Sequence, residues 1–171
     1  HAFSSTLKDL VNKKYDKGNK YFPPTTFQIS NLNSGVGATN IIPGQLSMDF
    51  NFRYSTETTC EELMSDITKI MDSSDLKYSI NWHHSGDPYL TEKKELLDIC
   101  VSATKEILDV TSNISTDGGT SDGRFIAKIC DQVIEFGLIN ESIHKINEHT
   151  TENDLRNTVK VYSQILKNIF N

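Results

Sequence analysis

The chain has 171 residues, which is enough for one ordinary domain or two small ones. Hydrophobic residues make up 36% and charged residues 23%, a globular composition that excludes a disordered tail. The net charge of −6, without clustered Lys or Arg, argues against a nucleic-acid partner. No apolar run approaches the roughly 20 residues of a membrane helix, so no membrane partner is expected.

Two further features concern compartment and processing. Cys60, Cys100 and Cys130 are widely spaced and lack a CxxC or zinc-knuckle pattern, which favours a reducing compartment over a disulfide scaffold. The sequence begins at His1 rather than a methionine and shows no leader pattern. We therefore expect a fragment or a processed product.

Residues 1–88 are predicted to form one α+β unit. Apolar spacing predicts helices over about 4–15 and 58–73. Alternation of apolar and polar residues predicts strands over 26–31, 48–54 and 76–82. The resulting order α-β-β-α-β is a ferredoxin-like β-α-β-β-α-β unit without its first strand. We expect truncation before His1 to have removed that strand.

Residues 89–171 are predicted to contain helices and a single strand. A helix is marked by apolar spacing from Leu96 to Leu108, a short helix carrying Phe125 follows the sequence TDGGTSDGR, and a short buried strand covers 132–136. The last helix is expected to be capped by Thr151. Its predicted core face is Leu155, Val159, Tyr162, Ile165, Leu166 and Ile169. Because one strand is no sheet, this α/β segment is predicted to be incomplete.

Two of the three arginines occupy conspicuous positions. Arg53 lies on the polar side of the clearest strand, and Arg124 ends the GGTSDGR segment. Arginine suits the two-point binding of a carboxylate, although a surface ion pair remains the alternative for Arg53. For Arg124, the neighbouring glycines permit close backbone approach, and a helix N-terminus is expected to offer N–H groups to an anion. Neither GVGATN nor GGTSDGR has the context of a nucleotide-binding loop.

The histidines are weaker candidates. His144 lies four residues before Glu148, a carboxylate suited to orient a metal-bound imidazole. Catalytic zinc needs three protein ligands, so spacing alone leaves a hydrogen-bonded loop histidine as the alternative. His83 and His84 are interpreted as surface residues, and His149 as a helix-entry residue. Ser85 and Ser121 lack a visible His/Asp partnership, which disfavours a serine hydrolase. Cys130 is expected to fill core space.

Five segments together carry a family resemblance: FPPTTFQISNLNSGVGATNIIPG, FNFRYSTE, SGDPYLT, GGTSDGRFIA and VIEFGLINESIHKINE. In this order they resemble the bacterial succinyl-diaminopimelate desuccinylase family, zinc-dependent metallohydrolases of the aminoacylase and carboxypeptidase type. The resemblance spans almost the whole chain. It implies hydrolysis of N-succinyl-L,L-diaminopimelate to succinate and L,L-diaminopimelate, on the pathway to lysine and peptidoglycan. It also implies a dinuclear zinc site, with cobalt as an alternative metal.

The resemblance further implies a cytoplasmic homodimer that pairs through a ferredoxin-like lid. Residues 1–88 correspond to most of that lid, and residues 89–171 to the last part of the catalytic domain. His144 matches a terminal zinc ligand, and Asn40 matches a lid residue that reaches the neighbouring subunit's active site. The positions that hold the small-molecule substrate, with its carboxylates and amino-acid end, are matched by Arg53, Ser85, Thr120, Arg124 and Asn140.

Two departures from the family bear on activity. Leu138 stands where the family often has proline, and we expect a locally altered loop there. The family's other zinc ligands, its general base and its oxyanion-stabilising lid histidine all precede the position of His1. We therefore expect no complete catalytic set, and no hydrolysis, from these 171 residues alone.

Two alternatives remain open. One is a sister metallo-deacylase, such as an acetylornithine deacetylase or an aminoacylase, although the residues of the FNFR and GGTSDGRF motifs argue against it. The other is that the chain alone acts as a non-catalytic dimerisation and anion-binding module, since the ferredoxin-like scaffold is a common pairing surface and a fold does not determine function.

Overall fold

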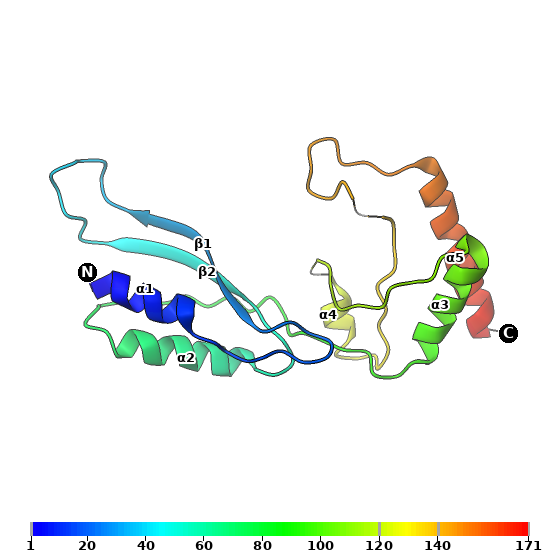
Figure 1. Ribbon diagram of the computed structural model, residues 1–171, viewed down its shortest axis with the longest axis horizontal. Helices are drawn as coiled ribbons and strands as arrows, with labels where there is room; N and C mark the ends of the chain where they lie inside the picture. The colour runs from blue at the N-terminus through cyan, green and yellow to red at the C-terminus, as the bar shows by residue number, and fades with distance from the viewer. Residues whose placement is uncertain (1, 120, 140, 171) are drawn as a thin grey trace. The chain divides into compact units, whose positions relative to one another are not determined.

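The computed structural model of the protein describes residues 2–119, 121–139 and 141–170. It divides into two compact units, of which the first ends at Pro88 and the second begins at Tyr89 (Figure 1). Within the described ranges, none of the helices combines the length and apolar character needed to cross a bilayer. Each unit is described separately below.

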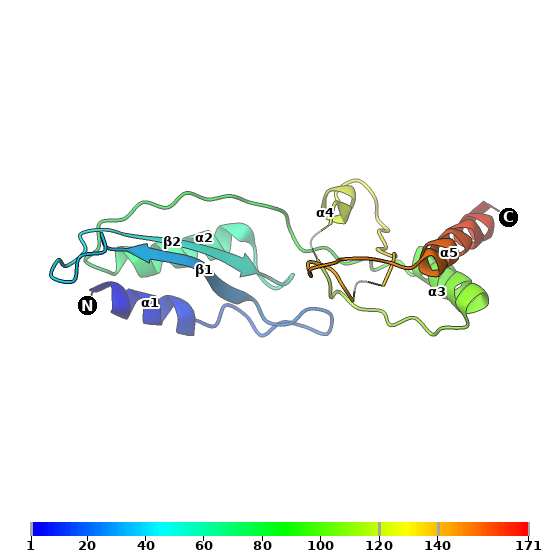
Figure 2. The same ribbon diagram turned by 90° about the horizontal axis from the view of Figure 1, so that it is seen from above.

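The first unit is a β-hairpin with two helices alongside it. Helix α1 spans Ala2–Asn12, strand β1 Thr26–Ser34, strand β2 Leu46–Arg53 and helix α2 Cys60–Asp72. The strands pair antiparallel with an irregularity between Ile29 and Asn31. Helix α1 contacts both α2 and β1, and both helices run along the hairpin in the two views (Figures 1 and 2).

Strand β2 confirms the alternation predicted from the sequence. Phe50 and Phe52 are half-buried, whereas Asp49 and Asn51 are exposed. The Phe27 ring lies 5.2 Å from that of Phe50 and 5.4 Å from that of Phe52, within the range of favourable aromatic pairs. These rings make one face of the hairpin apolar.

Helix α2 starts at Cys60 because a capping box satisfies its first N–H groups. The Thr59 hydroxyl accepts from the Glu62 N–H, and the Glu62 carboxylate accepts from the Thr59 N–H. Leu63 and Ile67 are then buried one turn apart, and Leu10 is buried on α1. Apolar spacing thus places these helices correctly, and the cap sets the first residue of α2.

The predicted strand over 76–82 is wrong. The described residues of the first unit form a sheet of two strands, and 76–82 has no backbone ladder to either of them. A strand exists only through hydrogen bonds to a neighbour, and β1 is the recorded partner of β2. The segment still packs onto the hairpin, since the Trp82 ring lies 5.6 Å from the Phe50 ring. The unit is therefore a small α+β structure whose sheet has two strands.

The second unit is built on two packed helices, α3 (Glu95–Leu108) and α5 (Glu152–Phe170). Cys100 and Ala103 of α3 and Val161 and Ile165 of α5 form the buried core between them. The cap predicted for α5 is confirmed, because the Asp154 N–H donates to the Thr151 hydroxyl at 3.1 Å.

The predicted core face of α5 is largely wrong. Ile165 is buried as expected, but the remaining predicted residues are 42–59% exposed: Leu155, Val159, Tyr162, Leu166 and Ile169. Helix α3 packs on the adjacent side of α5, where Val161 is fully buried. The α5 helix therefore carries two apolar faces, and only one of them is covered by the described residues.

The short strand predicted over 132–136 is also wrong, for the same reason as 76–82. The segment has no ladder partner, although Val133, Ile134 and Phe136 are half-buried. Tyr162 holds its end by donating from its hydroxyl to the Phe136 carbonyl at 2.5 Å. Cys130, expected in the core, is exposed.

Candidate functional site

In the first unit, Tyr54 brings two candidate segments together. Its hydroxyl lies 2.9 Å from Asp87 Oδ1, 3.0 Å from the Gly86 carbonyl and 3.2 Å from His84 Nε2. Tyr54 directly follows Arg53 at the end of β2, and the bonded residues flank Ser85. The segments that carry Arg53 and Ser85 are thus held side by side, with both residues exposed.

The Tyr54 hydroxyl remains a donor at neutral pH. Burial raises its pKa above the ordinary tyrosine value, and the hydrogen bond to Asp87 and the negative charge of that carboxylate raise the pKa further. Asp87 also lies 3.1 Å from His84 Nε2, an ion pair when the imidazole is protonated. His84 is therefore exposed, as expected, and it belongs to a polar cluster at the end of the hairpin.

Asn40 lies apart from this cluster. It is exposed in the loop between β1 and β2, next to the end where Ser34 pairs with Leu46. Arg53 pairs with Thr26 at the opposite end of the hairpin. The first unit therefore does not bring Asn40 and Arg53 together.

In the second unit, a carboxylate anchors the end of the GGTSDGR segment. Glu135 Oε1 accepts a hydrogen bond from the Tyr89 hydroxyl at 2.5 Å and another from the Ser121 hydroxyl. Ser121 Oγ in turn accepts from the Gly123 N–H at 3.0 Å. Burial, together with the bond to Glu135 and its charge, raises the pKa of Tyr89 to about 12, so this phenol stays protonated.

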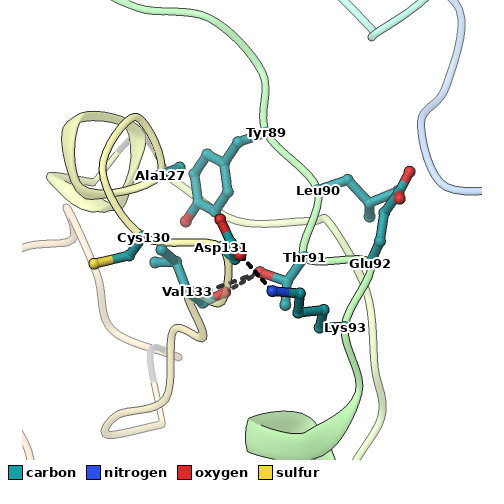
Figure 3. A pocket seen from close by; sticks show the side chains of 9 residues that line it. All are labelled: Tyr89, Leu90, Thr91, Glu92, Lys93, Ala127, Cys130, Asp131 and Val133. Carbon is teal, nitrogen blue, oxygen red and sulfur yellow. Dashed lines mark hydrogen bonds and ion pairs between the residues drawn. The ribbon is translucent and has the colours of Figure 1, made fainter.

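Side chains join the segment 89–93 to the segment 131–135. Thr91 Oγ1 donates to the Val133 carbonyl at 2.6 Å and accepts from the Val133 N–H at 2.9 Å. Lys93, two residues after Thr91, pairs with Asp131, two residues before Val133. Tyr89, two residues before Thr91, donates to Glu135, two residues after Val133. The two segments therefore run antiparallel in register, joined through side chains, and we call this the side-chain seam. Figure 3 shows its links from Thr91 to Val133 and from Lys93 to Asp131.

A shallow pocket of about 320 Å³ lies along the side-chain seam (Figure 3). Its walls are Tyr89, Leu90, Thr91, Glu92, Lys93, Ala127, Cys130, Asp131 and Val133. Lys93 and Asp131 in its wall form an ion pair with each other. The Lys93 ammonium is therefore already engaged and is a poor candidate for holding a substrate carboxylate.

Arg124 lies in α4, which spans only Gly123–Ile126. This helix is a single turn, which aligns few peptide dipoles, so an anion site at its start stays a prediction. Arg124 itself has a different signal. Its buried Nε has no hydrogen-bond partner among the described residues, and its guanidinium lies 4.6 Å from the Phe125 ring centroid. A buried donor without an acceptor is costly, and an anionic ligand would relieve that cost.

His144 is exposed in the loop before α5 and has a positive φ of 60°. Glu148 does not orient its ring as hypothesised; the carboxylate accepts from the His144 backbone N–H at 3.3 Å instead. Among the described residues, no group of three His, Cys, Asp or Glu could hold a metal ion. These residues alone therefore do not fit a zinc site. Thr120 and Asn140 lie outside the described residues.

The residues that organise both clusters stand in no functional motif of the sequence. Tyr54 lies in the strand predicted over 48–54, and Glu135 in the buried strand predicted over 132–136. The available signal was the single carboxylate within the apolar run QVIEF, because a charge in a strand predicted to be buried requires a partner; in the structure Glu135 is exposed. Tyr89 had no such signal.

Comparison with known proteins identifies the family. The model of peptidase family M20/M25/M40 matches residues 10–168. The chain is 49% identical over 170 residues to a protein of Vesicomyosocius okutanii subsp. Calyptogena okutanii named succinyl-diaminopimelate desuccinylase, covering 99% of this chain and 45% of that protein. Proteins of the same name from Hydrogenovibrio crunogenus and Albidiferax ferrireducens are 49% and 47% identical, again over 99% of this chain.

The chain thus spans less than half the length of these relatives, 45% of the Hydrogenovibrio protein and 43% of the Albidiferax protein. The family match, in contrast, runs through both units and includes Arg53, Arg124 and His144. The chain belongs to peptidase family M20/M25/M40.

Proposed function

We propose that these 171 residues are part of a succinyl-diaminopimelate desuccinylase, a metal-dependent amidohydrolase. The enzyme hydrolyses N-succinyl-L,L-diaminopimelate to succinate and L,L-diaminopimelate in lysine and diaminopimelate biosynthesis. The observation that carries this proposal is the 47–49% identity to proteins of that name over 99% of the chain. Identity at this level that extends through both units favours the same activity over a sister deacylase.

We assign residues 1–88 to a ferredoxin-like dimerisation lid and residues 89–171 to the C-terminal part of the catalytic domain. The division of the structure between Pro88 and Tyr89 supports this boundary. The unpaired segment 76–82 supports the lid, because in a β-α-β-β-α-β unit the last strand pairs with the first, which these residues do not include. The homodimer pairs through this lid in the cytoplasm, where three unpaired cysteines are stable.

The substrate's carboxylates are held by arginines and polar side chains of both units. Arg124 is the best supported of these, since its buried Nε has no acceptor within the part of the chain that the structure describes. Arg53 and Ser85 act from the cluster that Tyr54 organises, and Thr120 and Asn140 complete the set. Asn40, at the far end of the hairpin from Arg53, serves the neighbouring subunit's site.

The metal site is dinuclear zinc, with cobalt as an alternative, and this chain contributes one ligand, His144. The described residues hold no complete ligand set, so the remaining ligands and the general base belong to the rest of the longer polypeptide. The chain alone then neither binds zinc tightly nor hydrolyses the substrate. Tight stoichiometric zinc on the 171 residues alone would contradict this assignment.

The test is hydrolysis of N-succinyl-L,L-diaminopimelate, against N-acetylornithine, by a zinc-loaded polypeptide of the relatives' full length that contains this chain. We expect cleavage of the succinyl substrate only. His144→Ala is expected to abolish it and to lower bound zinc, whereas His149→Ala, five residues away, leaves zinc content unchanged. Cleavage of the acetyl substrate alone would move the protein to a sister activity, and cleavage of neither would overturn the proposal.

One observation favours a second role for the chain by itself. Because no metal-ligand group occurs among the described residues, the isolated 171 residues are expected to act as a non-catalytic dimerisation and anion-binding module. Sedimentation over a range of concentrations tests the pairing. A monomer at every concentration would remove this role.

A further inference from the structure

We propose that Glu135 is a positioning residue that fixes the end of the GGTSDGR segment, Ser121–Arg124, and so holds Arg124 in place for a substrate carboxylate. The role of Arg124 in this inference rests on the proposed function. The contacts of Glu135 are independent of that function and lie entirely within the second unit.

The first step of the argument is the chain of hydrogen bonds. Glu135 Oε1 accepts from Ser121, and Ser121 Oγ accepts from the Gly123 N–H, so the carboxylate is two bonds away from the backbone that precedes Arg124. Tyr89 holds the same oxygen from the other side. Glu135 therefore joins residues that are 46 and 14 positions away in the sequence.

The second step is the space around Gly123, which is buried. A Cβ at this position would lie 2.4 Å from the Tyr89 hydroxyl, 2.9 Å from Glu135 Oε1 and 3.0 Å from Ser121 Oγ. A side chain at position 123 would therefore meet the same three polar groups that form the hydrogen-bond chain. Glycine leaves that space to them, directly before Arg124.

The third step concerns which property of Glu135 matters. Both hydroxyls donate to one oxygen, Oε1. A glutamine offers one carbonyl oxygen at the same place, without the charge, whereas an aspartate keeps the charge but is one methylene too short. If positioning is the role, Glu135→Gln retains it and Glu135→Asp loses it. A purely electrostatic role gives the opposite order.

The first experiment uses the 171-residue chain and does not depend on activity. Amide hydrogen exchange at Gly123 is measured in the wild type and in Glu135→Ala, Glu135→Asp and Glu135→Gln. We expect exchange about tenfold faster with Ala and Asp, and within about twofold of wild type with Gln. The matched control is Tyr78→Phe, which removes a tyrosine–carboxylate hydrogen bond to Asp72 in the first unit. It is expected to leave Gly123 unchanged.

The second experiment measures KM and kcat in the zinc-loaded longer polypeptide. We expect Glu135→Ala and Glu135→Asp to raise KM about tenfold with kcat within about twofold, and Glu135→Gln to restore KM. Glu106→Gln on α3 is the control, because Glu106 is an exposed glutamate like Glu135 but lies outside this cluster; it should leave KM unchanged.

The two experiments separate the two proposals. The positioning role is overturned if Glu135→Ala leaves the Gly123 exchange rate unchanged. It is also overturned if Glu135→Gln loses the protection of this amide and Glu135→Asp keeps it. Both outcomes hold even if the enzyme is a desuccinylase. A polypeptide without desuccinylase activity overturns the proposed function, and the exchange data then decide on Glu135 alone. Faster exchange with an unchanged KM also overturns the inference, because the Arg124 position would then not depend on Glu135.

Discussion

Ser55 donates from its hydroxyl to Asp16 Oδ2 at 3.1 Å, across 39 positions of sequence. Asp16 Oδ1 accepts from the N–H groups of Gly18 and Thr25 as well. Since Ser55 is almost fully buried, this carboxylate joins the loop after α1 to the loop after β2 inside the first unit. The hydrogen-bond partners of Asp16 and Ser55 lie in these two loops, so the network has consequences for pH and for backbone geometry.

The first consequence is acid sensitivity of the first unit. Burial alone would raise the pKa of Asp16, but hydrogen bonds from Thr25, Gly18 and Ser55 outweigh it and lower the pKa below its usual value. A lowered folded-state pKa stabilises the fold above the unfolded value of about 3.9, and this stabilisation is lost as pH falls through the folded-state pKa. Asp16→Asn is therefore expected to flatten the loss of stability below about pH 4.

Urea unfolding followed by Trp82 fluorescence measures this, because Trp82 packs on Phe50 in the same unit. Asp9→Asn, an exposed carboxylate on α1, is the control and should keep the wild-type acid profile. Identical acid profiles for Asp16→Asn and the wild type would contradict the prediction.

Gly18 is expected to be intolerant of alanine. Its φ is +66°, and a Cβ would lie 2.5–2.6 Å from backbone atoms of Phe22, Pro23 and Pro24. Gly37→Ala is the control that shows the backbone strain without the collision. The φ of Gly37 is +80°, and no described atom lies within 4 Å of a Cβ there. Gly37→Ala should cost about 1–2 kcal/mol of unfolding free energy, and Gly18→Ala clearly more. Thermal unfolding of the two variants compares them; equal losses would mean that the collision is relieved.

Thr91 is expected to be essential to the side-chain seam. Thr91→Val keeps the shape but leaves both the Val133 N–H and carbonyl without this partner, at a cost of about 1–3 kcal/mol. Thr91→Ser keeps the hydroxyl and is the matched control. Exchange of the Val133 amide should accelerate in Thr91→Val and stay near wild type in Thr91→Ser. Equal rates in both would show that another group protects this amide.

Gly123→Ala is predicted to imitate Glu135→Ala. The new methyl group would collide first with the Tyr89 hydroxyl, so removing that oxygen in Tyr89→Phe should partly rescue Gly123→Ala. Amide exchange across Ser121–Arg124 in the single and double variants measures the rescue. Additive effects in the double variant would argue against direct contact between the two positions.

The sequence predicts elements whose hydrogen bonds close locally. The alternation around Phe50 gave the right strand because its partner, β1, lies just before it in the chain. Thr151 was identified as a cap because its bond to Asp154 spans three residues. In contrast, 76–82 and 132–136 have the residue types of strands, but pairing requires a neighbour that the described residues do not supply.

The residue types of the candidate site were recognisable in the sequence, whereas its contacts were not. Arg53, Arg124 and His144 stand in recognisable motifs, and their roles stay predictions. The bonds of Tyr54 to Asp87 and of Glu135 to Tyr89 span 33 and 46 positions. No periodicity encodes a contact of that range. The expected role of Glu148 failed for a related reason, since the backbone N–H of His144 was not considered as a competitor for the carboxylate.

The side-chain seam also affects how the second unit tolerates mutation. In an ordinary β-ladder, the bonding groups belong to the main chain, and any residue except proline supplies them. Here Tyr89, Thr91 and Lys93 supply the bonds from their side chains, while Leu90 and Glu92 between them form none of those bonds. Substitutions should therefore weaken the seam at positions 89, 91 and 93 and leave it intact at positions 90 and 92. A backbone ladder would tolerate most changes of side chain, whereas this pairing depends on the identity of the residues at 89, 91 and 93.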